Sequence, residues 1–234
     1  TASHAGVVPA VTHVVGEVLP YLAEASALFA LGELGLDDGD VVPALAQGGT
    51  FLGSSRPLYG LPFNRSTPIA YFNGEELARL GKNPPATWDE LALFAAAATH
   101  GEQGDVRYGF GCPIDWWFWV ALLGQAGGTV TDEGGAVTLG GPAGEEALRL
   151  WQRLVHDDHT MRPPPGRDYN AWQAVNADFL AKRTAMIWTS TAFLRYLEQN
   201  AKFPVVAAPL PANVRRAVPT GGTFFVVPRG ALDP

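Results

Sequence analysis

The sequence predicts an α/β fold, and two observations carry that prediction. Apolar runs of strand length alternate with helical patterns along most of the 234 residues, which is the order of elements in α/β proteins. Several of these runs end in a polar corner, where α/β proteins commonly hold a ligand. With 47% hydrophobic residues, the chain is long enough for one large domain or two small lobes, each with its own core.

Charge and composition limit the classes of partner. Asp and Glu together number 23 against 16 for Lys and Arg, so the net charge is -7. This balance argues against nucleic acid as a partner, and an anionic ligand would need a local basic group. No apolar stretch reaches the roughly 20 residues that span a bilayer, so we expect a soluble protein. The lone cysteine, Cys112, cannot form an internal disulfide and is expected to be a small buried side chain.

A strand and a helix are expected first. The apolar run at residues 7–15 predicts a buried strand, and a helix is expected over residues 19–34, where leucines recur at helical spacing. Glu17 lies between the two, at a position that aims side chains into α/β clefts. The same position suits a carboxylate that stabilises the start of a helix.

A polar corner divides two apolar runs within residues 61–73. The corner is Asn64 to Thr67, and it includes Ser66. Pro68 closes it and biases Thr67 away from helical angles, so the chain should stay extended while it exposes hydroxyls and backbone donors to a polar ligand. The following run, residues 69–72, is β-branched and aromatic, which predicts a buried strand.

The next predicted helix has a recognisable start. Thr87 and Glu90 match the capping-box pattern, so Thr87 should accept a hydrogen bond from the Glu90 amide, and the Glu90 carboxylate should accept one from the Thr87 amide. The pattern predicts a helix from Trp88 to about Thr99.

The densest aromatic cluster follows a predicted strand at residues 106–112. Trp116, Trp117 and Trp119 fall within four positions, and a helix cannot point all three inward, so at least one should be exposed or line a cleft. Flat aromatic faces stack on sugar rings, which makes the cluster a candidate ligand platform. The alternative is a hydrophobic helix packed between lobes.

The second half continues the alternation of elements. We expect strands at residues 136–139, 184–188, 203–207 and 223–227, helices at 143–158, 169–182 and 192–200, and a connector at 162–168. Ser190 precedes a helix, where it could cap the helix or where free amides could hold a ligand oxygen. At Gly222, the missing side chain lets backbone approach a ligand. His156 and His159 have metal-binding spacing but no third ligand nearby, so neither a metal nor a cofactor is predicted.

No catalytic motif is present, so an enzyme is not predicted. The sequence holds no G-x-S-x-G, H-E-x-x-H or G-x-x-x-x-G-K pattern. One enzyme alternative stays open, a carbohydrate-active hydrolase that uses two carboxylates, with Glu17 and Asp115 as candidates. A non-binding interaction module is another alternative.

The polar corner, its aromatic strand and the segment PPATWDEL at residues 84–91 resemble the bacterial extracellular solute-binding proteins of carbohydrate ABC importers (family 1). The likeness is strongest to the glycerol-3-phosphate-binding branch and continues through Gly221-Gly222-Thr223. It implies a periplasmic-binding-protein-like fold with two α/β lobes and a ligand cleft between them, here partial because the chain is truncated at both ends relative to the family. Implied segments are 1–72 (part of the N-terminal lobe and a crossover strand), 73–183 (C-terminal lobe) and 184–234 (a return segment with crossover strands).

The resemblance also implies a function and a site. The function is that of a substrate-binding component, periplasmic or extracellular and membrane-associated, that captures glycerol 3-phosphate or a related sugar or polyol phosphate and delivers it to ABC permease subunits. The chain has no initiator Met and no signal peptide, as a processed exported chain would show. The arginine that meets phosphate in the family has no counterpart here, so sugar, glycerol phosphate and glycerophosphodiester all stay open as ligands. The implied ligand contacts are Glu17, Ser66, Ser190, Gly222 and one of Trp116, Trp117 and Trp119. We expect Ser66, Ser190 and Gly222 to line one cleft, with Glu17 at its rim.

Overall fold

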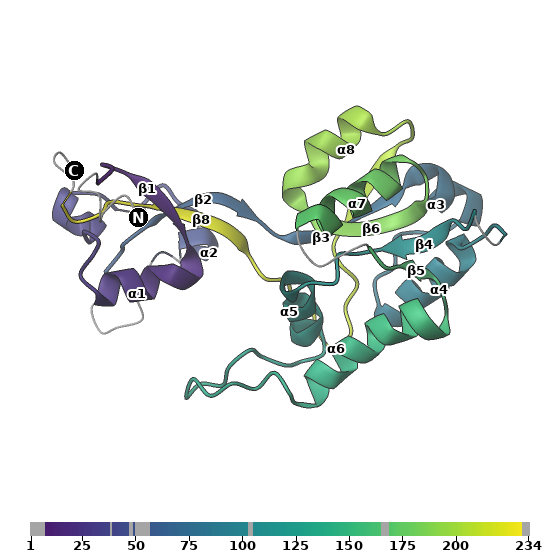
Figure 1. Cartoon of the computed structure of the whole chain (residues 1–234), viewed down its shortest axis with the longest axis horizontal. Coiled ribbons are helices and arrows are strands. Elements are labelled where there is room, and N and C mark those ends of the chain that lie inside the picture. Colours follow the sequence, from purple (N-terminus) through teal and green to yellow (C-terminus); the bar gives the residue numbers. More distant parts are fainter. Residues whose placement is uncertain are drawn as a thin grey trace. The chain divides into compact units, whose positions relative to one another are not determined.

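The computed structural model describes residues 8–37, 39–46, 49, 57–102, 105–164 and 169–230. The chain divides into two compact units. Unit 1 is Thr1–Ser66 with Thr220–Pro234, and unit 2 is Thr67–Pro219. Figure 1 labels most of the helices and strands of both units. This division places the strand that follows the polar corner in unit 2. The segments that the family resemblance implies, 1–72, 73–183 and 184–234, place that strand in the first segment as a crossover strand. That finer division stays a prediction.

Unit 1 is built on a three-stranded antiparallel sheet. Its strands are β1 (Thr12–Val15), β2 (Leu61–Ser66) and β8 (Gly221–Val226), in the order β1-β8-β2. The central strand β8, near the C-terminal end of the described chain, therefore pairs with β1, near its N-terminal end. Short helical segments accompany the sheet: η2 (Gly16–Val18), α1 (Leu19–Glu24), η3 (Leu31–Leu34) and α2 (Pro43–Ala46). A small core forms between them from Leu19, Leu28, Phe224 and Val226.

A helix begins at Leu19, as predicted, but the prediction that it continues to residue 34 is wrong. The helix α1 ends at Glu24, Ser26 adopts a left-handed φ of 52°, and Leu28 forms an isolated bridge with Pro228. Leu28 is only 3% exposed, so its burial against the end of β8 outweighs the few hydrogen bonds that a longer helix would add. The first strand is also shorter than predicted, and Val7 lies outside the described residues.

Unit 2 contains a five-stranded mixed sheet. Its strands are β3 (Pro68–Asn73), β4 (Tyr108–Gly111), β5 (Met161–Arg162), β6 (Thr184–Ser190) and β7 (Val205–Ala208), in the order β5-β4-β6-β3-β7. β4 is parallel to its neighbours β5 and β6, and β3 is antiparallel to both β6 and β7. Strands predicted from residues 69–72, 184–188 and 203–207 are thus confirmed, with small shifts at their ends.

Helices cover both faces of this sheet (Figure 1). They are α3 (Gly74–Leu80), α4 (Trp88–Ala98), α5 (Trp116–Gln125), α6 (Pro142–Gln152) with a π-helical turn (Arg153–Asp157), α7 (Tyr169–Leu180), η6 (Thr191–Phe193) and α8 (Leu194–Asn200). Along β6, Met186 and Trp188 face the core formed with α4, α5 and α6, whereas Ile187 faces α7 and α8. This alternation follows from the two-residue period of a strand and gives the layered α/β arrangement that the sequence predicted.

Two local predictions need correction. Thr87 caps α4 by accepting the Glu90 amide at 3.2 Å, as expected, but the Glu90 carboxylate accepts the amide of Ala86 at 2.7 Å rather than that of Thr87. The capping box is therefore half formed, because the Thr87 amide is not the one within reach of the carboxylate. The strand predicted at residues 136–139 is wrong as well, since Val137 forms only an isolated bridge with Thr131.

Two further expectations concern burial and membranes. Cys112 is buried, and burial raises the pKa of its thiol well above the ordinary value, so it is the buried side chain that the sequence predicted. Among the helices in the described ranges, none combines the length and apolar character needed to cross a bilayer.

Candidate functional site

Several strands of the unit 2 sheet begin or end along one edge of the sheet. β4 and β6 run parallel, so Gly111 and Ser190 both end at this edge. β3 runs the other way and begins there, with Pro68 opposite Ser190. β7 ends beside them at Ala208, opposite Ala70. We call it the carboxyl edge, and it is the place where open α/β sheets bind ligands because helix starts and free backbone groups converge there.

A hollow of about 640 Å³ lies where the chain leaves β4 and enters α5. Its lining consists of Ile114, Asp115, Trp116, Trp119, Leu148 and Trp151, and we call it the tryptophan hollow. Trp116 is 57% exposed, and its ring lies 5.7 Å from the ring of Trp119, tilted by 36°. The prediction that at least one of the three clustered indoles is exposed at a hollowed surface is therefore confirmed by Trp116.

Trp117 lies differently from Trp116. Its ring packs 5.5 Å from that of Trp172 in α7, and Trp172 lies 5.0 Å from the ring of Phe118. These contacts join α5 to α7 through a continuous set of aromatic rings. Trp117 is not among the residues that line the tryptophan hollow, so its role in ligand binding stays a prediction.

Asp115 holds the start of α5. Its Oδ1 accepts the backbone amides of Trp117 and Phe118 at 3.0 and 3.3 Å, which makes Asp115 the N-cap of the helix. Its Oδ2 accepts the indole N–H of Trp172 at 2.7 Å. Burial raises the pKa of the Asp115 carboxyl, while the three hydrogen bonds act in the opposite direction.

Sequence reasoning named Asp115 only as a catalytic acid of the hydrolase alternative. A signal for its capping role was available, because an Asp directly before an apolar helical run is a favourable N-cap. Its link to Trp172 could not be read from the sequence, since 57 positions separate the two residues.

Ser190 is also a cap. It is 7% exposed, and its Oγ accepts the amide of Ala192 at 3.1 Å, so the capping role that the sequence allowed is confirmed. Next to it, the Thr67 amide donates to Thr191 Oγ1 at 3.2 Å, and the Thr191 amide donates to the Thr67 carbonyl at 3.0 Å. A ligand contact by Ser190 would use its hydroxyl hydrogen, and that contact stays a prediction.

A second hollow, of about 440 Å³, lies at the β3 and β7 end of the carboxyl edge. It is lined by Thr67, Pro68, Ile69, Ala207, Ala208, Pro209, Leu210, Arg216, Ala217 and Val218. Within the described part of the chain, Arg216 is the one charged residue of that lining, and its Nη1 makes a long contact of 3.5 Å with the Leu210 carbonyl. Arg216 is not among the ligand contacts that the sequence predicted.

Unit 1 holds the other predicted contacts. Ser66 ends β2 opposite Gly221, so the structure brings Ser66 and Gly222 close together. Gly222 has a φ of 109°, and a Cβ there would overlap the backbone of Asn64 and Arg65. The close approach that the missing side chain permits is therefore that of β2, which is irregular between Phe63 and Ser66.

Glu17 lies in η2 of unit 1 and is exposed. Burial lowers the pKa of the Arg65 guanidinium, and the negative charge of Glu17 offsets part of this shift. The Arg65 guanidinium lies 4.7 Å from the centre of the Phe224 ring, a cation–π arrangement. Arg65 thus lies near three of the predicted contacts, Glu17, Ser66 and Gly222, although the sequence did not predict a ligand contact for Arg65 itself. The expectation that Ser190 shares one cleft with Ser66 and Gly222 spans both units and stays a prediction.

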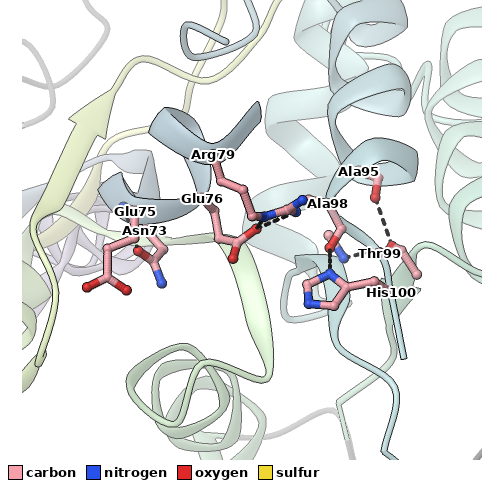
Figure 2. A network of polar contacts seen from close by, with 9 residues as sticks. Asn73, Glu75, Glu76, Arg79, Ala95, Ala98, Thr99 and His100 are labelled. Carbon is pink, nitrogen blue, oxygen red and sulfur yellow. Dashed lines mark hydrogen bonds and ion pairs between the residues drawn. The ribbon is translucent and has the colours of Figure 1, made fainter. Parts of the chain in front are cut away.

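A separate polar cluster lies at the opposite edge of the unit 2 sheet (Figure 2). Asn73 caps α3 by accepting the Glu75 amide at 2.9 Å, and Glu76 pairs with Arg79 at 2.7 Å. The His100 ring donates to the Ala98 carbonyl at 2.9 Å. Because these groups bond one another and nearby backbone, we assign the cluster a structural role.

Comparisons with known proteins agree on one family. The model of the bacterial extracellular solute-binding protein family matches residues 1–234. A binding protein of Brucella abortus is 31% identical over 179 residues, which are 72% of this chain and 40% of the relative. A protein of Deinococcus radiodurans named as an ABC transporter-binding protein is 30% identical over 155 residues, 59% of this chain and 35% of the relative. The arabinooligosaccharide-binding protein of Bacillus subtilis is 25% identical over 194 residues, 77% of this chain and 42% of the relative. The chain spans less than half the length of these curated relatives.

Solved structures show the same fold. The GacH receptor of Streptomyces glaucescens, solved without ligand and with acarbose, superposes with a TM-score of 0.83 at 24% identity, over 99% of this chain and 60% of that one. UgpB of Mycobacterium tuberculosis in complex with glycerophosphocholine gives a TM-score of 0.76 at 24% identity, over 94% of this chain and 55% of that one. The fold is therefore α/β and periplasmic-binding-protein-like, as the sequence predicted.

Proposed function

The chain belongs to the bacterial extracellular solute-binding proteins, and from this premise we propose that it forms part of the exported substrate-binding component of an ABC importer. The observation that carries the proposal is the exposed indole of Trp116 beside the tryptophan hollow at the carboxyl edge. An apolar hollow with a few fixed polar groups at a sheet edge is the usual form of a small-molecule site. Delivery of the captured ligand to a membrane permease belongs to the same proposal.

The ligand class that fits the tryptophan hollow best is an uncharged sugar or polyol. The flat faces of Trp116 and Trp119 suit the C–H faces of a sugar ring. Asp115 is the one charged side chain among the lining residues that the structure describes, and a carboxylate in a partly buried position repels an anionic ligand. Two similar proteins support the sugar class: one relative is named an arabinooligosaccharide-binding protein, and one structural neighbour was solved with acarbose.

Glycerol 3-phosphate, the ligand suggested by the sequence, is a second candidate. Two observations favour it: Arg216 supplies a cation at the carboxyl edge, and one structural neighbour holds glycerophosphocholine. Arg216 is exposed, however, and an exposed ion pair contributes little in water. We therefore expect the 234-residue chain to bind glycerol 3-phosphate poorly or not at all.

The hydrolase alternative gains no support from the tryptophan hollow. Asp115 already accepts three hydrogen bonds from the protein, and among the described residues that line the hollow it is the one carboxylate. Paired carboxylates at a defined separation are what glycoside hydrolysis requires. Release of the chromophore from a chromogenic glycoside would revive this alternative.

The proposal is tested by calorimetric titration of the chain with maltose, arabinooligosaccharide, glycerol 3-phosphate and glycerophosphocholine. We expect an uncharged saccharide to bind and Trp116→Ala to weaken that binding about tenfold or more, because one stacked aromatic face is lost. Tyr196→Ala is the matched control, since Tyr196 is an exposed aromatic residue in α8 (47% exposed) outside the hollow. Absence of binding by every saccharide would sink the sugar assignment. Micromolar binding of glycerol 3-phosphate that Arg216→Ala abolishes would replace it with the phosphate ligand.

A further inference from the structure

Asp115 joins two helices and the ligand platform in one set of hydrogen bonds. One carboxylate oxygen accepts the amides of Trp117 and Phe118 in the first turn of α5, and the other accepts the indole N–H of Trp172 from α7 at 2.7 Å. Trp116, the first residue of α5, is the indole exposed at the tryptophan hollow. The carboxylate therefore fixes where α5 begins and how it lies against α7.

Aromatic packing around this carboxylate restricts the position of the Trp172 ring, which donates one of its hydrogen bonds. The Trp172 ring packs 5.5 Å from Trp117 and 5.0 Å from Phe118, tilted by 39° to each, so rotation of the Trp172 ring would disturb the first turn of α5. Buried hydrogen bonds to a charged acceptor are stronger than those between neutral groups. Loss of the Trp172 bond would leave that first turn with packing contacts alone against α7.

We infer that Asp115 is a positioning residue of the ligand site: it sets the orientation of Trp116 at the tryptophan hollow through the cap of α5 and the indole of Trp172. This rests on the proposed sugar-binding function. Three of the roughly four acceptor sites of a carboxylate are occupied by protein donors. The alternative role, a direct hydrogen bond from Asp115 to a ligand hydroxyl, would use the one acceptor site that remains.

Two variants separate these roles. Asp115→Asn keeps an oxygen that can cap α5, since Asn is as good an N-cap as Asp, but its NH₂ group cannot accept the Trp172 N–H. Trp172→Phe removes the same hydrogen bond from the other side and keeps an aromatic ring. Each single variant should weaken saccharide binding about tenfold. The double variant should bind no more weakly than either single variant, because both substitutions remove the same hydrogen bond between Asp115 and Trp172.

Trp88→Phe is the matched control. It also removes an indole N–H bond to α5, the 2.8 Å bond from Trp88 to Gln125 at the far end of the helix. We expect this control to leave saccharide affinity within about twofold of the parent. Equal weakening by Trp88→Phe would show that general loosening of α5 causes the effect, which overturns the positioning role. An additive loss in the double variant would overturn it in favour of a direct contact between Asp115 and the ligand.

A measurement without ligand keeps this inference separate from the proposed function. The near-ultraviolet circular dichroism of the chain reports the coupling between neighbouring indoles such as Trp117 and Trp172. Asp115→Asn, which keeps every indole, should change the indole bands while the far-ultraviolet spectrum stays that of the parent. If no saccharide binds the parent chain but the near-ultraviolet spectrum of Asp115→Asn differs from that of the parent, the proposed function fails and the positioning of the indoles stands. An unchanged indole spectrum in Asp115→Asn would overturn the positioning role itself.

Discussion

Protonation of Asp115 should make the stability of the fold depend on pH. Burial raises the pKa of its carboxyl, so the folded protein binds this proton more tightly than the unfolded chain, whose Asp pKa is about 3.9. Its contribution to stability is therefore fully present below about pH 3.9 and is lost as the pH rises through the higher folded pKa. The neighbouring Cys112 thiol stays neutral, because burial raises its pKa well above the ordinary value.

Carbon-13 NMR of the Asp side-chain carboxyls measures this pKa directly. We expect one resonance with a midpoint above about 3.9, absent from the spectrum of Asp115→Asn. A midpoint at or below that ordinary value would contradict the dominance of burial over the three hydrogen bonds at this site.

Gly222 is expected to be required for the packing of unit 1. Its φ of 109° is unfavourable for other residues, and an added Cβ would overlap the backbone of Asn64 and Arg65. Gly222→Ala should lower the free energy of unfolding by about 2 kcal/mol or more. Gly32→Ala is the control, because Gly32 is exposed in η3 and an added Cβ there meets nothing within 4 Å. Chemical denaturation checks both variants, and similar stability for the two would contradict the packing argument.

At the scale of elements, the start of α4 depends on its N-cap. Thr87 Oγ1 accepts the Glu90 amide, so Thr87→Ala should destabilise the protein by about 1 kcal/mol. Thr131→Ala, at an exposed threonine, should change stability by less than about 0.5 kcal/mol. Urea denaturation followed by circular dichroism measures both. An effect of Thr87→Ala no larger than that of Thr131→Ala would mean that the cap does not stabilise α4.

At the scale of the whole molecule, each unit has its own core. Leu19 belongs to the core of unit 1 and Leu91 to that of unit 2, and both are fully buried. Replacing either with Ala should cost about 2 to 5 kcal/mol. We expect Leu19→Ala to reduce hydrogen-exchange protection in unit 1 only and Leu91→Ala to reduce it in unit 2 only, because each core stabilises its own unit. Equal loss of protection in both units for each variant would show that the molecule unfolds as one cooperative body.

The local elements were largely set by the sequence. The β-branched and aromatic run 69–72 became the buried strand β3, Thr87 became a cap, and the crowding of three tryptophans at 116, 117 and 119 left one of them exposed. Each of these outcomes depends on neighbours within a few positions, through backbone preference, capping or the period of a helix. Local sequence is sufficient for effects of this range.

Tertiary structure decided what distant residues share. The sequence alone determined that the chain is α/β, that it carries aromatic and hydroxyl groups at strand ends, and which family it resembles. It did not determine that α1 stops at Glu24 so that Leu28 can be buried beside Pro228, or that Asp115 holds Trp172 across 57 positions. These outcomes depend on which surfaces meet after the strands pair, and burial of apolar area and satisfaction of buried polar groups then outweigh local preference.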